Sequence, residues 1–204
     1  MKDIKEFYYD KLLNIRTGKG QRDNEGSLHY HPYEPTPYGA LEELFKQYEV
    51  HSSDRIVDFG CGKGRVNFFI HYFHGASIVG VEMNERFYQE AIENLRSYQR
   101  NTKKAAGLEF CCCLAEDYPI KTEDNVFYFF NPFTIQIFMK IIGNILKSAE
   151  KRRRKIELVL YYGSEDYMFF LENQTPFELM EEILLPGLSE RDPFERFLIY
   201  RLAE

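Results

Sequence analysis

Short apolar runs alternate with longer segments of helical spacing along most of the chain. The runs predict buried strands, because they are brief, rich in β-branched and aromatic residues, and bounded by polar or glycine-containing stretches. Strands that alternate with helices of ten or more residues are typical of a parallel sheet covered on both faces. The predicted strands are RIVDF, ASIVGVE, LEFCCCLA, NVFYFF and IELVLYY, and the predicted helices fall within residues 1–15, 36–48, 66–73, 87–98 and 135–146.

The last forty residues break this alternation. SEDYMFFL predicts a brief helix, whereas FELMEEILLP and ERFLIYRL predict two strands joined by the turn-rich GLSERDP. We therefore expect an antiparallel hairpin on one edge of the sheet. The expected organisation is one α/β domain over residues 38–204, preceded over residues 1–37 by a helix with Ile4, Phe7, Tyr8 and Leu12 on one face and by a lid-like polar loop.

Thr36 and Pro37 predict the start of the helix before the first strand, with Thr36 as N-cap and Pro37 in the first helical position. The loop at residues 17–29 and the cluster Tyr30, His31, Tyr33, Thr36 and Tyr38 precede the fold, which suggests a lid over a ligand.

Composition narrows the class of protein. The 204 residues are 44% hydrophobic and 28% charged, with a formal net charge of −6, so extensive binding of nucleic acid through its phosphates is not expected. No apolar run approaches the ~20 residues of a membrane span, and a cytoplasmic protein is expected. We interpret the basic run KRRRK at residues 151–155 as a solvated turn, because it precedes the fifth strand and complements the end of the helix before it.

The cysteines and histidines give no metal-binding pattern. Cys111, Cys112 and Cys113 are adjacent and predict small buried hydrophobic residues, while Cys61 either packs or touches a ligand. His29 and His31 are offset by two, which suits neither a helical metal site nor a catalytic triad, so we expect surface histidines and no metal.

Gly60, Gly62 and Gly64 follow the first predicted strand and open the next helix. Bare backbone at such a junction lets a ligand approach amide groups and the positive end of a helix dipole, which favours a nucleotide-like ligand. Glu82 ends the second strand, at the distance along the chain where an acid binds a ribose diol. Asp58 is a charge inside the first strand and needs a partner, either a ligand ammonium or amides of the turn.

The spacing of the glycines disfavours a dinucleotide. In the G-x-G-x-x-G fingerprint the third glycine comes one residue later, where this chain has Arg65. VDFGCGKGR instead resembles the cofactor loop of class I S-adenosylmethionine-dependent methyltransferases. VGVEMN, LAEDYPI and YFFNPF resemble that family's ribose, adenine and substrate-facing segments, so that the resemblance spans roughly residues 36–202.

The resemblance implies a Rossmann-like three-layer αβα sandwich, a mostly parallel seven-stranded sheet with an antiparallel C-terminal hairpin, and S-adenosyl-L-methionine as cofactor. It assigns Asp58, Gly60 and Gly62 to the amino-acid half of the cofactor and Glu82 to the ribose. The acid that often precedes the alanine at Ala115 is replaced by Leu114, so adenine recognition is assigned to Glu116, with Asp117 as the alternative. The expected cofactor-binding residues are Thr36, Tyr38, Asp58, Phe59, Gly60, Cys61, Gly62, Gly64, Glu82, Met83, Ala115 and Glu116.

Asn131, Pro132 and Phe133 are the expected catalytic residues. They are similar to the [DNS]-P-P-[YFW] motif of methyltransferases that act on planar amino groups, with one proline missing. The Asn131 oxygen orients an amino nucleophile, Pro132 stiffens the turn and Phe133 stacks on the acceptor. We therefore expect transfer to nitrogen of an unidentified protein, RNA or small molecule. An oxygen acceptor, a nucleotide-binding oxidoreductase and a noncatalytic S-adenosylmethionine-binding regulator remain alternatives, and the oligomeric state is open.

Overall fold

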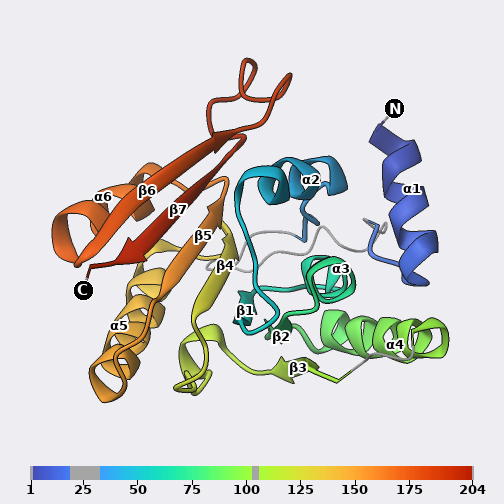
Figure 1. Ribbon diagram of the computed structural model, residues 1–204, viewed down its shortest axis with the longest axis horizontal. Helices are drawn as coiled ribbons and strands as arrows, with labels where there is room; N and C mark the ends of the chain where they lie inside the picture. Colours follow the sequence, from blue (N-terminus) through green and yellow to red (C-terminus); the bar gives the residue numbers. More distant parts are fainter. Residues whose placement is uncertain (1, 19–32, 103–105, 204) are drawn as a thin grey trace.

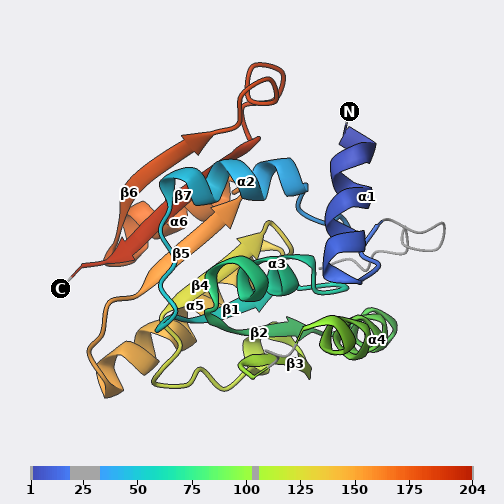
Figure 2. The same ribbon diagram turned by 45° about the vertical axis from the view of Figure 1, so that its right-hand side comes forward.

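The computed structural model describes residues 2–18, 33–102 and 106–203, and its helices lie on both faces of one central sheet (Figures 1 and 2). The strands are β1 Arg55–Phe59, β2 Ser77–Glu82, β3 Leu108–Cys112, β4 Val126–Phe130, β5 Glu157–Tyr161, β6 Phe177–Leu184 and β7 Arg196–Leu202. The helices are α1 Lys2–Leu13, α2 Tyr38–Gln47, α3 Arg65–His74, α4 Glu85–Asn101, the 3-10 turn η1 Ala115–Asp117, α5 Ile135–Lys151 and α6 Glu165–Gln174.

The strand order is β3-β2-β1-β4-β5-β7-β6. The first five strands run parallel, whereas β7 runs antiparallel between β5 and β6, with Tyr161 opposite Phe197. This confirms the predicted three-layer fold and its closing hairpin. The order reverses direction at β1 and β4, so their carboxyl ends frame the crevice where open α/β sheets bind ligands.

Two apolar layers pack on opposite faces of the sheet because alternate strand residues point to opposite sides. Ile56 and Tyr128 belong to the layer beneath α2 and α3, while Val57 and Phe127 belong to the layer beneath α5 and α6. The many phenylalanines and tyrosines fill these layers; Phe138 and Tyr167, for example, stack with ring centroids 3.7 Å apart. No helix in the described part of the chain is long and apolar enough to cross a bilayer.

Helix α1 forms as predicted, but its apolar stripe does not face the core. Ile4, Phe7 and Tyr8 are 71%, 70% and 58% exposed. The inward side of α1 is polar instead: Glu6 pairs with Arg65 of α3, and Asp10 accepts hydrogen bonds from the backbone and hydroxyl of Thr17. Helical spacing alone does not reveal which face of a helix is buried.

The predicted N-cap of α2 is wrong. Helix α2 begins at Tyr38 with Pro37 as the capping residue, and no side chain caps it. The Thr36 hydroxyl lies 2.8 Å from the Tyr128 hydroxyl of β4 and forms a buried hydrogen bond with it, so it does not cap the helix. Thr36 thereby fixes the segment before α2 above the carboxyl end of β4.

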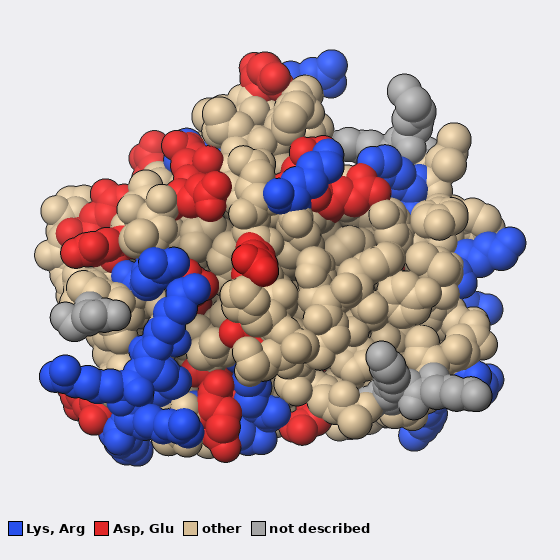
Figure 3. Space-filling view, in the orientation of Figure 1, with Lys and Arg blue, Asp and Glu red and all other residues tan. Residues whose placement is uncertain are grey.

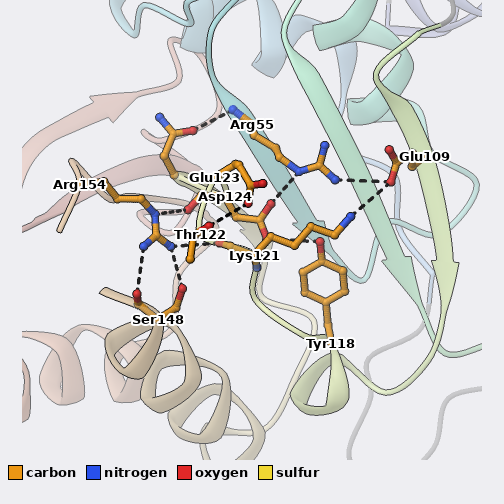
Figure 4. Close-up of polar contacts among 10 residues, drawn as sticks. Arg55, Glu109, Tyr118, Lys121, Thr122, Glu123, Asp124, Ser148 and Arg154 are labelled. Atoms are coloured by element: carbon orange, nitrogen blue, oxygen red, sulfur yellow. Dashed lines mark hydrogen bonds and ion pairs between the residues drawn. The ribbon is translucent and has the colours of Figure 1, made fainter. Parts of the chain in front are cut away.

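The basic run at residues 151–155 lies at the amino ends of the parallel strands. Figure 3 shows Lys and Arg side chains gathered at the lower left, where α5 ends in Figure 1. Arg154 donates to the carbonyl oxygens of Asp124 at 2.8 Å and Ser148 at 3.2 Å (Figure 4). The Ser148 carbonyl belongs to the last turn of α5, so the prediction that this run complements the helix end is confirmed.

The edge strand β3 changes the expectation for the cysteines. Cys61 is buried, whereas Cys112 is exposed and Cys111 and Cys113 are half-buried. Strand β3 lies at the edge of the sheet and pairs with β2 alone, so fewer neighbouring elements cover its side chains. The prediction of three buried cysteines is therefore wrong for Cys112.

Candidate cofactor and acceptor site

A cavity of about 480 Å³ lies at the carboxyl ends of β1, β2, β4 and β5. This volume is within the usual range of ligand pockets, about 300–1,000 Å³. Of the residues predicted from the sequence, those that line it are Thr36, Asp58, Gly60, Cys61, Glu82, Met83, Ala115, Asn131, Pro132 and Phe133. The structure thus gathers both the proposed cofactor residues and the proposed catalytic residues in one space.

The three glycines of the loop have different roles: Gly60 borders the cavity, whereas Gly62 and Gly64 leave room for packed side chains. Gly60 lines the cavity, and its amide donates to Val81 of β2 at 2.8 Å. Gly62 and Gly64 are not among the lining residues. A Cβ on Gly62, whose φ is +55°, would lie 2.2 Å from the Tyr33 ring, and one on Gly64 would lie 2.6 Å from the Phe110 ring. These two glycines are required because aromatic side chains pack directly on the loop.

Glu82 connects the ends of β1 and β2. Its Oε2 accepts from the Gly62 amide at 2.9 Å, and its Oε1 accepts from the Asn84 amide at 2.7 Å. Burial raises the pKa of Glu82, and these amide hydrogen bonds oppose the shift. A carboxylate has about four acceptor positions, so Glu82 can also accept from a hydroxyl of a ligand in the cavity that it lines.

Asp58 is a buried carboxylate that lines the same cavity and is only 3% exposed. Burial, and then the charge of Glu82, raise the pKa of Asp58 to about 8. Its protein partner is Asn67 of α3, whose amide, oriented to satisfy both of its neighbours, donates to Oδ2 at 2.9 Å and accepts from the Gly80 amide at 3.1 Å. Sequence reasoning missed Asn67; the signal was a polar residue within the apolar stretch RVNFFI.

The opposite wall suits a flat ring system. Met83, Phe87, Cys113 and Ala115 line this part of the cavity, from the ends of β2 and β3 and the start of α4. The structure does not bring Glu116, the predicted adenine ligand, to the cavity. Its carboxylate lies 3.6 Å from the ammonium of Lys140 in α5 instead, because η1 turns it toward that helix.

Two further predicted residues support the site from behind. The Phe59 ring stacks on Phe129 at 5.2 Å inside the core. Tyr38 is fully buried, its hydroxyl donates to Asp10 at 2.7 Å, and the guanidinium of Arg65 lies 4.4 Å from its ring centroid. Neither residue lines the cavity.

Arg65 stands where the dinucleotide fingerprint has its third glycine. Its Nε donates to the Thr17 hydroxyl at 2.8 Å and its Nη1 to the Thr36 carbonyl at 3.1 Å, and it pairs with Glu6. It is 3% exposed and lines the cavity. Arg65 therefore fastens α1 and the segment before α2 to the glycine loop, a role that the sequence did not reveal.

The proposed lid is described only in part. Tyr33 lies over the glycine loop, with its hydroxyl donating to the Thr17 carbonyl at 2.7 Å and its ring 4.9 Å from that of Phe87. His29, Tyr30 and His31, with most of the loop at residues 17–29, lie outside the described residues. Within the described ranges, no group of three or more His, Cys, Asp or Glu side chains is placed to hold a metal ion.

The catalytic candidates follow β4. Asn131 has a φ of +37°, an uncommon conformation for a residue other than glycine. Pro132 contacts the glycine loop, since a Cβ on Gly60 would lie 2.9 Å from the Pro132 Cβ. Phe133 is buried, and its carbonyl accepts from the Tyr167 hydroxyl at 2.6 Å. Asn131 and Phe133 thus face the cavity from a turn anchored on both sides.

The cavity continues past Asn131 to residues that the sequence did not single out. They are Glu34, Phe130, Tyr161, Tyr162, Asp192 and Glu195. The paired tyrosines at the end of a predicted strand were the available signal. Asp192 and Glu195 come from the loop between β6 and β7, whose position depends on the folded hairpin, and Glu34 comes from the segment before α2.

No protein-family model matches the sequence, and no curated protein matches it significantly. Solved structures do match its fold. An RNA methyltransferase from Salinibacter ruber, in complex with S-adenosyl-L-homocysteine, aligns with a TM-score of 0.57 at 20% identity, over 82% of this chain and 92% of the other. A human methyltransferase 10 domain containing protein aligns with a TM-score of 0.64 at 11% identity, over 99% of this chain and 95% of the other.

The N-terminal domain of human METTL16, in complex with SAH, gives a TM-score of 0.61 at 12% identity, over 99% of this chain and 80% of the other. Identities this low concern the architecture alone. Together with the strand order and the antiparallel β7, they confirm the resemblance at the level of the fold: this chain has the fold of the class I S-adenosylmethionine-dependent methyltransferases.

Proposed function

We propose that the protein is an S-adenosyl-L-methionine-dependent methyltransferase that transfers the methyl group to nitrogen. The observation that carries the proposal is the single cavity lined by buried Asp58, by Glu82 and by Asn131 at the carboxyl ends of three parallel strands. Two of the solved structures reported above are named as methyltransferases, and two were crystallised with S-adenosylhomocysteine, the demethylated cofactor, which supports the choice of ligand.

The lining residues fit this cofactor. Buried Asp58 has one protein donor at Oδ2, so its carboxylate suits the ammonium of the amino-acid half. Glu82 would hold the ribose hydroxyls, and Met83, Phe87 and Ala115 would enclose the adenine. The cofactor supplies an activated methyl group on a sulfonium, so this chain's residues need only align the acceptor and exclude water.

Nitrogen is favoured as the acceptor atom by the turn after β4. The side-chain oxygen of Asn131 can accept a hydrogen from an amino group and so direct its lone pair toward the cofactor half of the cavity. Pro132 and the Tyr167 contact to Phe133 restrict movement of this turn. Positioning of this kind accelerates reactions without a protein acid or base.

Calorimetric titration of the purified protein with S-adenosylhomocysteine and with NADH tests the ligand. We expect binding of S-adenosylhomocysteine alone, because the loop lacks the dinucleotide spacing. Tighter binding of NADH would contradict the proposal and favour an oxidoreductase.

Asn131→Ala tests the transfer site. We expect turnover to fall about 100-fold, in line with the loss of an aligned geometry, while the affinity for S-adenosylhomocysteine changes less than twofold. Asn173→Ala, at an exposed site of α6, is the matched control. Equal losses of turnover and cofactor affinity in Asn131→Ala would refute the proposal that Asn131 orients the methyl acceptor.

A further inference from the structure

The end of the cavity beyond Asn131 is built by the antiparallel hairpin. Strand β7 begins at Arg196 and runs opposite to β5, so the loop before it lies at the carboxyl ends of β4 and β5. This loop brings Asp192 and Glu195 beside Tyr161 and Tyr162, and Glu34 of the segment before α2 completes the wall.

Negative charge dominates this end. Among the described residues that line the cavity, Arg65 is the only Lys or Arg, and Glu6 already pairs with it. The hydrogen bond to Asp192 and burial, followed by the charges of Asp192, Glu195 and Glu34, raise the pKa of Tyr162 to about 12. The charges of Asp192, Glu195 and Glu34 therefore act together at the Tyr162 hydroxyl.

Hydrogen bonding within the wall does not neutralise this charge. The Tyr161 hydroxyl donates to Glu195, and the Tyr162 hydroxyl donates to Asp192 Oδ2 at 2.6 Å. The same hydrogen bond to Asp192, with that from the Phe194 amide, lowers the pKa of this carboxyl. The donors are neutral hydroxyls, which orient the two carboxylates and place no positive charge beside them, so both acids are available to a cationic ligand.

Aromatic rings line the same space. The Phe130 and Tyr161 ring centroids are 4.4 Å apart, and Tyr162 and Phe133 add further rings to the cavity wall. Aromatic faces attract cations, most strongly where water is excluded. Rings and carboxylates in one cavity favour a ligand that carries a positive charge next to an apolar group.

This step rests on the proposed methyltransferase function. We propose that the methyl acceptor is an amine that is cationic at neutral pH, bound by Glu34, Asp192 and Glu195 and by the rings of Phe130, Tyr161 and Tyr162. The same carboxylates repel the phosphates of a nucleic acid from this end of the cavity. The amine belongs either to a small molecule or to a lysine side chain of a basic peptide.

The transfer is balanced without a further reactant. The bound ammonium first releases one proton to water, which frees the nitrogen lone pair. That lone pair forms the N–C bond to the methyl carbon, while the S–C bond breaks and its electron pair stays on sulfur. The positive charge passes from the sulfonium to the methylated nitrogen, close to the carboxylates that stabilise it.

The test measures transfer of a radiolabelled methyl group to three sets of acceptors at saturating S-adenosylmethionine. They are 2-phenylethylamine with related small amines, a lysine-rich peptide, and total cellular RNA. The alcohol and the carboxylate with the same skeleton as 2-phenylethylamine are matched controls, and calorimetry measures how tightly each small molecule binds the complex with S-adenosylhomocysteine.

We expect the amines to bind at least tenfold more tightly than the matched alcohol, and label to appear in the amine or peptide set, which identifies the source. Asp192→Asn and Glu195→Gln keep the hydrogen bonds from the tyrosines but remove charge, so each should weaken amine binding about tenfold and leave S-adenosylhomocysteine binding unchanged. Glu190→Gln, an exposed acid of the same loop, is the control and should change neither.

Each of the opposite results would refute one part of the proposal. Binding of S-adenosylhomocysteine with label in RNA alone, or amines that bind no better than the alcohol, would refute the amine acceptor and leave the methyltransferase intact. Unchanged amine binding in the two variants would refute the role of the carboxylates. Failure to bind S-adenosylhomocysteine at all would refute the proposed function itself.

Discussion

At the scale of the residue, Asp58 is an acid that the sheet and α3 bury almost completely. It is buried beside Glu82, and its pKa is raised to about 8, whereas an unfolded chain would ionise it near ~4. Between these two values the folded protein binds more protons than the unfolded protein. The free energy of unfolding of the ligand-free protein should therefore decrease as pH rises from about 4 to about 8.

Asp58→Asn should weaken this dependence on pH, and Glu82, whose pKa burial also raises, should keep part of it. We expect the variant to match the wild type near pH 4 and to be more stable than the wild type at pH 8, by up to about 1.4 kcal/mol for each pH unit of the window. Urea unfolding at a series of pH values measures the difference. Asp117→Asn, at an exposed acid, should keep the slope of the wild type; the same slope in Asp58→Asn would show that Asp58 ionises normally.

At the scale of the element, Arg154 links three segments at the amino end of the sheet. Its hydrogen bonds join the end of α5 to the turn before β4 (Figure 4). Another hydrogen bond reaches the carbonyl of Arg152, in the segment between α5 and β5. Arg154→Ala should lower the free energy of unfolding by about 1–2 kcal/mol, because several carbonyls lose a charged donor. Arg153→Ala, at an exposed neighbour, should change it by less than about 0.5 kcal/mol in the same urea measurement. Similar losses in both would indicate a general effect of charge.

The elements themselves are what the sequence predicts best. Apolar runs set the strands, helical spacing sets the helices, and the offset between Gly60 and Glu82 correctly places both at one edge of the sheet. These features are local or follow from the direction of parallel strands. The turn at residues 131–133 was also placed correctly, since it directly follows a strand that pairs with β1.

The remaining features depend on packing between distant segments. Asn67 reaches Asp58 only because α3 lies on β1 and β2, and Asp192 reaches Tyr162 only because β7 inserts between β5 and β6. Likewise, the family resemblance assigns adenine recognition to Glu116, but its side chain turns to Lys140. The position of a residue along the chain predicts at which edge of the sheet it lies. The direction of its side chain can be assigned only once the packing of the folded chain is known.

At the scale of the whole molecule, Arg65 is the buried charge that joins the N-terminal segment to the cofactor half, beside other contacts such as the hydrogen bond of Tyr38 to Asp10. An isolated helix as short as α1 is marginal in water, so its order depends on contacts such as that between Glu6 and Arg65. Arg65→Met should increase backbone hydrogen exchange in residues 4–18 at least tenfold and leave β1, β4 and β5 unchanged. Mass spectrometry measures this exchange. Arg100→Met, at an exposed site on α4, should show no increase, and full protection of α1 in Arg65→Met would exclude this anchoring role.

The placement of β7 separates two tasks along the chain. Residues that would hold the methyl donor come from the first half of the sheet, whereas Asp192 and Glu195 of the far wall come from the connection between β6 and β7. A surface connection tolerates insertions and exchanges far better than the interior of a sheet does. Descendants of such a protein can therefore acquire new acceptors by remodelling one hairpin connection while the machinery for the common donor is inherited intact.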